Sequence, residues 1–258
     1  MIRMKGCSFR AEQQYVGWIK RYIFFHNKQH PRDLRFAQVE EYLSYLATKR
    51  LVESSTHNQA LAALLFLYRH VSKIELPWLI NIVRSKRPQR LPVVLTRAAV
   101  RSVLAHLDGD AYLVASLLYR TGLRLMEALR LRVQDIDFSR SQIIVPCGKG
   151  GKDRSTMLPT TLVEPLTAHL VRTRERHLIA VERGFGGVEL AGALARKYPS
   201  AHLEWIWQYV FPSRKPAIDL RTNERRRQHL LPRYVQNHVY GAIRPAQVSK
   251  LASCHMFR

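Results

Sequence analysis

Residues 121–131 read TGLRLMEALRL, and residues 141–159 read SQIIVPCGKGGKDRSTMLP. The first stretch suits a helix on which Arg124 and Glu127 form a pair at i and i+3. In the second stretch, β-branched residues lead into a run of glycine and lysine, and another short run follows before a proline. This pattern predicts a β-hairpin that directly follows the helix.

Helical periodicity flanks the hairpin on both sides. The helices expected in this half of the chain are 96–107, 111–119, 161–182 and 234–243. Thr96 is the predicted N-cap of the first of them. Residues 183–231 are rich in Gly, Pro, Arg and aromatic residues and predict irregular structure. Residues 95–258 therefore predict a unit that is mainly α, with a small β-sheet or hairpin.

The first eighty-odd residues predict an all-helical bundle with basic outer faces. The helices expected there are 9–25, 36–46, 55–71 and a short one at 78–83. We place this unit at residues 1–84. The next segment, SKRPQRLPVV at 85–94, has two prolines and several basic residues, among them Arg87 and Arg90. Its composition is that of a linker, either lying against phosphates or simply solvated.

The charge of the chain favours a polyanionic partner. Its 258 residues contain 42 Lys and Arg against 19 Asp and Glu, a formal net charge of +23. A folded protein this basic binds nucleic acid with salt-sensitive affinity, because phosphate contacts release counterions. Another anionic partner, such as a membrane surface, is the alternative, and nucleic acid is favoured.

Cysteine usage and hydropathy exclude several other classes. Cys7, Cys147 and Cys254 are odd in number and have no CxxC spacing, which argues against a disulfide framework or a zinc site. No apolar run is as long as a membrane span, and the amino terminus lacks the hydrophobic core of a signal peptide. We therefore expect a cytoplasmic protein with no membrane partner.

Several motifs, in order, resemble one enzyme family. The pattern TGLRxxEaLxLxxxDID, the GKGGKDR hairpin and HxxR at 255–258 are similar to the catalytic domain of tyrosine recombinases, the phage integrase family. The preceding helical unit resembles their core-binding, SAM-like domain. The stretches STHNQALAALLFLYRHV and RLPVVLT, at 55–71 and 90–96, are similar to integron integrases in particular. The resemblance implies a helical core-binding domain followed by an α+β catalytic domain.

The resemblance assigns catalytic roles to four basic residues. Arg124 and Arg258 are implied to bind the reacting phosphate, because arginine stays protonated and donates paired hydrogen bonds to phosphate oxygens. Lys149 is implied to protonate the leaving 5′ oxygen, and His255 to assist proton transfer. Each residue also has an ordinary structural alternative: an Arg–Glu pair on a surface helix, a lysine in a turn, or a structural histidine. Lys152 competes with Lys149 and is expected to contact phosphate instead.

No cofactor or metal is expected. The glycine-rich stretch lacks the GxxxxGK[ST] spacing of a nucleotide-binding loop, and neither carboxylates nor histidines show metal-ligand spacing. The resemblance implies a reaction that keeps its bond energy in a covalent 3′-phosphotyrosyl link.

The region 190–213 resembles an insertion that integron integrases carry in the catalytic domain. The stretch KYPSAHLEWIWQYVFPS, at 197–213, is similar to the extra helix of that insertion. Trp207 matches the subgroup's tryptophan that stacks on an extruded base. Residues 225–233, RRRQHLLPR, resemble a histidine-rich segment near the DNA, with Gln228 in the place of the first histidine and His229 matching the second. The alternative is that Trp205, Tyr209 and Phe211 are ordinary core residues.

The combined expectation is a recombinase that integrates mobile gene cassettes into DNA. Its expected partners are double-stranded and folded single-stranded recombination sites, on which the intact family member acts as a homo-tetramer. All eleven tyrosines precede HxxR, whereas the family's nucleophile follows it, so we expect a fragment that is inactive alone. The alternatives are a non-catalytic DNA-binding remnant or regulator and a basic RNA-binding protein.

Overall fold

The computed structural model describes residues 9–74, 94–146, 153–190, 192–218, 223–248 and 253–257. The chain divides into two compact units, residues 1–90 and 91–258, each with its own hydrophobic core. The predicted linker at 85–94 lies outside the described residues except for Val94, so the roles of Arg87 and Arg90 stay predictions.

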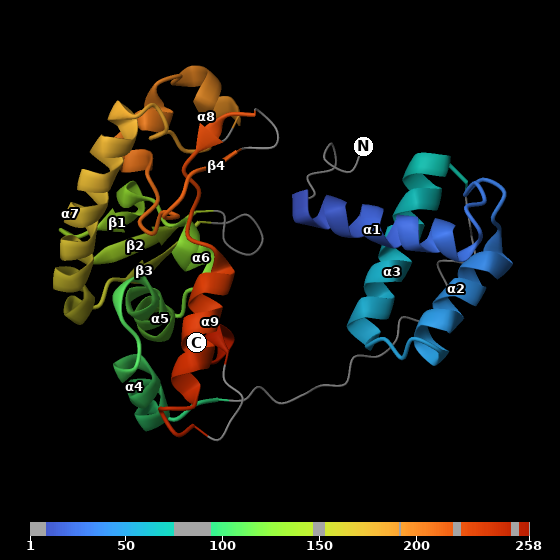
Figure 1. The fold of residues 1–258 in the computed structure, drawn as a ribbon, viewed down its shortest axis with the longest axis horizontal. Coiled ribbons are helices and arrows are strands. Elements are labelled where there is room, and N and C mark those ends of the chain that lie inside the picture. Colours follow the sequence, from blue (N-terminus) through green and yellow to red (C-terminus); the bar gives the residue numbers. More distant parts are fainter. Residues whose placement is uncertain are drawn as a thin grey trace. The chain divides into compact units, whose positions relative to one another are not determined.

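The first unit is a bundle of helices, as its periodicity predicts (Figure 1). Its elements are α1 (Phe9–Phe25), α2 (Phe36–Thr48), α3 (Ser54–Phe66) and a π-helical turn, η2 (Leu67–Ser72), that continues α3. Apolar residues at helical spacing, such as Tyr22, Val39 and Leu64, are fully buried where the helices meet. The short helix expected at 78–83 lies outside the described residues.

Two buried tyrosines connect the start and the end of this bundle. The Tyr22 hydroxyl lies 2.8 Å from that of Tyr68, and the Tyr68 hydroxyl donates to the Leu34 carbonyl at 3.0 Å. Since Tyr68 donates its proton to Leu34, Tyr22 must donate to Tyr68. Burial raises the pKa of both hydroxyls, which keeps them protonated and able to donate.

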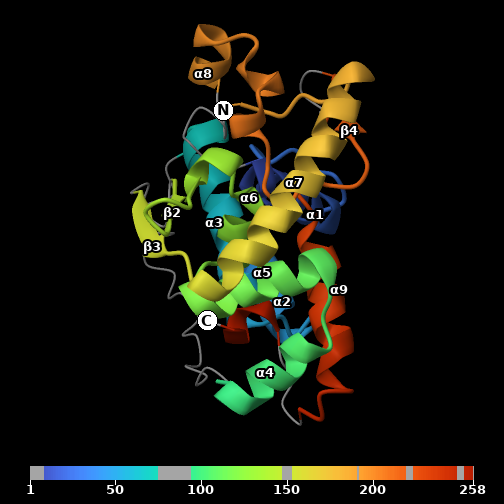
Figure 2. The same cartoon turned by 90° about the vertical axis from the view of Figure 1, so that its left-hand side faces the viewer.

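The second unit is built around one buried helix. Its larger elements are α4 (Arg97–Ala105), α5 (Gly109–Thr121), α6 (Leu125–Arg130), α7 (Thr160–Glu182) and α9 (Pro232–Ile243). Helix α5 contacts the other four (Figure 2). Its residues Val114, Leu117 and Leu118 are completely buried. Thr96 accepts a hydrogen bond from the Ala99 N–H at 3.1 Å, which confirms the predicted N-cap of α4.

A three-stranded antiparallel sheet follows α6. Its strands are β1 (Ile136–Asp137), β2 (Gln142–Val145) and β3 (Arg154–Met157), in that order across the sheet. Val145 pairs with Arg154 and Gln142 with Met157, which confirms the predicted hairpin. The hairpin tip, residues 147–152, lies outside the described residues. The observed fold is thus mainly α with a small antiparallel sheet, as predicted.

Residues 183–231 are largely irregular, and the helix expected within 197–213 is not formed. A regular helix, α8 (Gly192–Lys197), precedes that stretch, which itself contains two 3-10 turns, Ala201–Leu203 and Trp205–Trp207. The Gln208 side chain donates to the carbonyls of His202 and Glu204, both at 3.0 Å. These bonds replace helical ones, and the chain then pairs with residues 131–132 through a bridge between Arg132 and Tyr209. Two short strands, β4 (Ala217–Ile218) and β5 (Arg225–Arg226), complete the region.

Replacing Tyr68 with phenylalanine is expected to lower the free energy of unfolding of the first unit by about 1–3 kcal/mol, because the buried Leu34 carbonyl loses its donor. Native-state hydrogen exchange of the α1 and α3 amides in the intact chain measures this loss. Tyr45→Phe is the matched control, since the Tyr45 hydroxyl has no hydrogen bond to a described residue. Equal protection in the two variants would contradict the role of Tyr68.

Candidate active site

Arg124 lies in the short turn between helix α5 and helix α6. Gly122 ends α5 in the left-handed conformation, with φ of 67°, a geometry that favours glycine. Arg124 then takes the extended N-cap position of α6. The turn therefore brings the arginine to the surface directly after a helix whose residues 113–118 are buried in the core.

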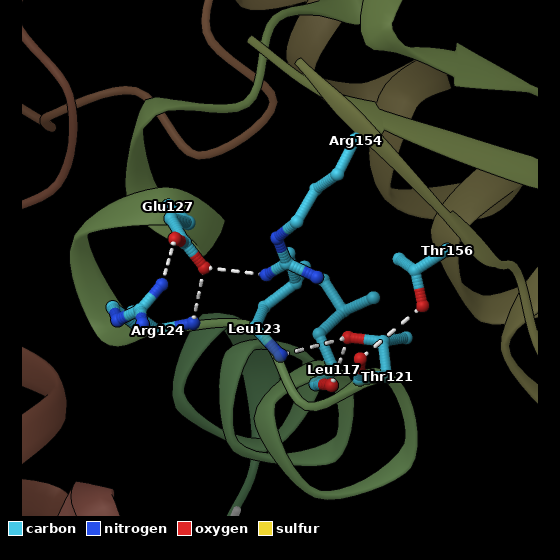
Figure 3. Close-up of polar contacts among 7 residues, drawn as sticks. All are labelled: Leu117, Thr121, Leu123, Arg124, Glu127, Arg154 and Thr156. Atoms are coloured by element: carbon cyan, nitrogen blue, oxygen red, sulfur yellow. Dashed lines mark hydrogen bonds and ion pairs between the residues drawn. The ribbon is translucent and has the colours of Figure 1, made fainter. Parts of the chain in front are cut away.

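Glu127 holds Arg124 and connects it to the sheet (Figure 3). One carboxylate oxygen accepts from the Arg124 Nη1 at 2.7 Å, and the other accepts from the Arg124 backbone N–H and from the Arg154 Nη2, both at 2.7 Å. Arg154 is the first residue of β3, so the carboxylate joins the start of α6 to the strand that leaves the hairpin. The Arg–Glu pair suggested by the spacing in the sequence is confirmed, and Arg154 is an additional partner.

The electrostatics of this cluster suit an anionic ligand. Burial alone raises the pKa of Glu127, but hydrogen bonds from Arg124 and Arg154 outweigh it and hold the pKa below its usual value. One carboxylate therefore stays ionised between two guanidinium groups, which leaves a net positive charge. Both arginine side chains are 37% exposed, so each keeps N–H donors available to a phosphate oxygen.

A second set of hydrogen bonds fixes the same turn to the sheet (Figure 3). The Thr121 hydroxyl donates to the Leu117 carbonyl at 2.6 Å and accepts from the Leu123 N–H at 3.3 Å. The Thr156 hydroxyl of β3 donates to the Thr121 carbonyl at 3.2 Å. The backbone before Arg124 is thereby held to the same strand that carries Arg154.

Three of the four residues predicted to act on the phosphate cannot be placed by their side chains. Lys149 and Arg258, with Lys152, lie outside the described residues, and only the backbone of His255 is described. His255 belongs to a 3-10 turn, η7 (Cys254–Phe257), that contacts α5 and α9. Cys254 and Phe257 are buried in the core of the unit, so the turn is packed against the helix that leads to Arg124.

Neither Cys254 nor a metal centre supplies an alternative chemistry among the described residues. Burial raises the pKa of Cys254 to about 11, which keeps its thiol protonated and unreactive near neutral pH. In the described ranges, no three His, Cys, Asp or Glu side chains are grouped as a metal site. Within the same ranges, no helix is both long and apolar enough to cross a membrane.

Trp207 lies on the irregular segment and is held there by Arg132. Arg132 donates from Nη1 to the Trp207 carbonyl and from Nη2 to the Glu189 carbonyl at 2.7 Å. Its guanidinium also lies over the Tyr209 ring, 4.8 Å from the ring centre. Trp207 is only partly buried, whereas Tyr209 and Phe211 are buried. The alternative that these aromatic residues belong to the core is therefore correct for Tyr209 and Phe211.

His229 and Gln228 are both half-buried in the strand-like segment before α9. The His229 Nδ1 donates to the Leu230 carbonyl at 2.9 Å, which leaves Nε2 as an acceptor. Burial lowers the pKa of His229, so the ring is neutral near pH 7. A contact with DNA at this position would therefore be a hydrogen bond to a neutral imidazole.

Sequence reasoning missed the roles of Arg154 and Arg132. Arg154 is the last residue of the KDR sequence in the hairpin motif. It is far from Glu127 along the chain, so no local pattern predicted their ion pair. Arg132 lies three residues before the DID motif, which begins at Asp135, and nothing in the sequence indicates that it binds distant carbonyl groups.

Comparisons with known proteins identify the family. A family model described as "Phage integrase family" matches residues 94–258, and one described as "Phage integrase, N-terminal SAM-like domain" matches residues 1–78. The chain therefore belongs to the phage integrase family of tyrosine recombinases, with the two domain types that the motifs predict.

Two relatives, each called "Integrase/recombinase", are from Escherichia coli and Pseudomonas aeruginosa. Each is 44% identical over 257 residues, which cover 100% of this chain and 76% of the relative. The transposon Tn1549 integrase in complex with transposon right end DNA has a similar fold, with a TM-score of 0.63 at 14% identity, over 99% of this chain and 81% of that chain. A lambda integrase tetramer bound to a Holliday junction also has a similar fold, with a TM-score of 0.59 at 13% identity, over 99% of this chain and 64% of that chain.

Replacing Glu127 with glutamine is expected to destabilise the second unit by about 1–3 kcal/mol at pH 7, because two guanidinium groups lose their charged partner. The folded pKa of Glu127 is lowered, so its stabilisation is complete above its unfolded value of about 4.5 and is lost as the pH falls through the lower folded value. Urea unfolding of wild type and E127Q between pH 7 and pH 3 measures the difference in their free energies of unfolding. This difference should become smaller as the pH falls.

Glu164→Gln is the matched control, since Glu164 is an exposed carboxylate on α7. It should leave stability unchanged at every pH. A loss in E127Q that is the same at pH 7 and pH 3 would show that its carboxylate charge does not contribute.

Proposed function

We propose that the protein catalyses site-specific recombination of DNA by phosphodiester transesterification. The observation that carries this proposal is the position of Arg124, half-exposed at the end of a buried helix and hydrogen-bonded to Glu127, which Arg154 also contacts. A preformed cationic donor of this kind stabilises the charge that develops on the phosphate oxygens in the transition state. The formal charge of +23 supports DNA as the substrate.

The proposed chemistry joins a tyrosine to one end of the cut strand. The tyrosine oxygen attacks the phosphorus, the bond to the 5′ oxygen breaks, and Lys149 gives that oxygen a proton. Arg124 and Arg258 bind the non-bridging oxygens, and His255 assists proton transfer. The 3′-phosphotyrosyl link keeps the bond energy for religation, so the step needs no metal or other cofactor.

The substrate that we propose is the recombination site of a mobile gene cassette, as in integron integrases. The support is the irregular insertion, about residues 190–213, in which Arg132 holds the partly exposed Trp207. These hydrogen bonds fix the backbone at Trp207, and its partly exposed ring can stack on an extruded base of a folded single strand. Gln228 and His229 would add hydrogen bonds to DNA, and Lys152, Arg87 and Arg90 would add phosphate contacts.

The proposed assembly is a homo-tetramer on DNA in the cytoplasm. It is supported by the similar fold of the lambda integrase, whose structure is a tetramer bound to a Holliday junction. The sequence also suits a reducing compartment, since its three cysteines have no paired spacing.

DNA binding without strand exchange is the second candidate function. All eleven tyrosines precede the HxxR motif, whereas the family's nucleophile follows it. We therefore propose that none of these eleven tyrosines is the nucleophile.

A suicide DNA substrate tests this assignment. The 258-residue polypeptide is expected to shift a cassette-site DNA in a native gel, and none of its eleven tyrosines is expected to form a denaturation-resistant protein–DNA band, because all of them precede HxxR. The control is an Integrase/recombinase relative with a tyrosine after its own HxxR. A covalent band that maps to any of the eleven tyrosines, or that is lost in the Tyr234→Phe or Tyr240→Phe variant, would contradict the assignment.

Affinity for DNA is expected to fall steeply with salt, because binding by a chain of charge +23 releases counterions from phosphates. The slope of log affinity against log salt, measured by fluorescence anisotropy between about 50 and 200 mM salt, reports the number of phosphate contacts. An affinity that does not change with salt concentration would contradict DNA as the substrate.

Replacing Trp207 with alanine is expected to weaken binding of a folded single-stranded cassette site by about 5- to 150-fold, the value of one base–aromatic stack. Affinity for a fully paired duplex of the same sequence should not change. Trp207→Phe is the control, since it keeps a ring that can stack. Equal losses on the folded strand and on the duplex would contradict the proposed base recognition.

A further inference from the structure

A basic pocket lies between α7 and the segment that follows Trp205 in the second unit. Its volume is about 270 Å³, and its lining includes Arg176 and His177 from α7, Trp205, Arg214 and Arg227. None of the residues that line this pocket is a carboxylate. Three arginines therefore share one pocket without a neutralising acid in its wall.

The arginines of the pocket act on one another. Burial, and then the positive charge of Arg176, lower the pKa of Arg227. Arg227 donates from Nη1 to the Ser213 carbonyl at 3.0 Å, but its Nε is buried and has no hydrogen bond among the described residues. Arg176 and Arg214 are exposed at the rim. An anion in the pocket would relieve this repulsion.

His177 also lines the pocket, and one of its ring nitrogens has no hydrogen bond among the described residues. The ring is 6% exposed, and its Nε2 donates to the Leu203 carbonyl at 2.9 Å. The remaining Nδ1 is buried and has no hydrogen bond among the described residues. Burial, with the charge of Arg227, lowers the pKa of His177, so Nδ1 is an acceptor that lacks a donor. The Trp205 ring packs on the other side of His177, 5.8 Å between ring centres.

We propose that this pocket binds a phosphate group. A phosphate offers several acceptor oxygens to the guanidinium groups of Arg176, Arg214 and Arg227. The three guanidinium groups therefore favour an oxyanion with several acceptor oxygens, such as a free phosphate or a phosphodiester.

Carboxylates lie beyond the rim and limit how the ligand enters. Arg176 and Arg214 also line a neighbouring hollow, together with Asp108 and Asp110. No ion pair joins either arginine to a carboxylate among the residues that the structure describes. The acids therefore make the outer region less favourable for an anion and direct it to the inner end, beside Arg227 and His177.

The phosphate can come from two sources, a free inorganic or small-molecule phosphate or the backbone of bound DNA. Binding of free phosphate does not depend on the proposed recombination activity, and its measurement without DNA tests the pocket alone.

The test is a titration of the intact chain with inorganic phosphate at constant ionic strength, followed by calorimetry and by the NMR signals of the His177 ring. Saturable binding that moves the His177 signals is expected. The double variant R176M/R214M should weaken it by about tenfold or more, because it removes two charged donors. The matched control R174M/R183M removes two exposed arginines that do not line the pocket and should change affinity less than about twofold.

A parallel titration in the presence of a DNA site separates the two sources. If DNA blocks phosphate binding, and R176M/R214M weakens DNA binding more than R174M/R183M does, the pocket takes a backbone phosphate. If phosphate still binds beside DNA, the pocket takes a free phosphate. Absence of saturable binding, or equal phosphate affinity in wild type and both double variants, would overturn the proposal, whatever the recombination activity of the chain.

Discussion

The carboxylate that Arg124 and Arg154 share is the interaction on which the rest of the candidate active site depends. Glu127 accepts a hydrogen bond from each guanidinium and from the Arg124 backbone N–H, all at 2.7 Å. Because α6 and β3 meet through this one group, the position of Arg124 is set by the sheet as well as by its own helix. An arginine held in place before a phosphate arrives loses little conformational freedom on binding it.

The remaining structure of the second unit serves to place this cluster. The middle of helix α5, residues 113–118, is buried, and Gly122 turns the chain so that Arg124 leaves the core directly after the helix. Hydrogen bonds from Thr156 and around Thr121 connect the same turn to β3. The 3-10 turn that carries His255 packs against α5 through Phe257. One rigid helix therefore supports two of the residues proposed to act on the phosphate.

Much of this fold was predictable from the sequence, because it depends on local patterns. Periodicity and capping chemistry predict the Thr96 cap, the hairpin strands and helix α9. The expected helix within 197–213 was wrong, because Gln208 bonds to nearby carbonyls and the chain pairs with residues 131–132 instead. The contacts of Arg154 with Glu127 and of Arg132 with Glu189 join distant parts of the chain, and no local pattern indicates them. The motif order indicated Arg124 as a site residue, but only the fold shows what holds it.

The most direct test of this account is the structure of the chain bound to a DNA recombination site, with attention to the atoms around Arg124. The account predicts that the Arg124 guanidinium donates to non-bridging oxygens of one DNA phosphate while Glu127 still accepts from both Arg124 and Arg154. It also predicts that the phosphate lies within reach of Arg258. A complex in which the DNA runs elsewhere on the unit, with Arg124 bonded only to Glu127 and no phosphate beside it, would contradict the central claim.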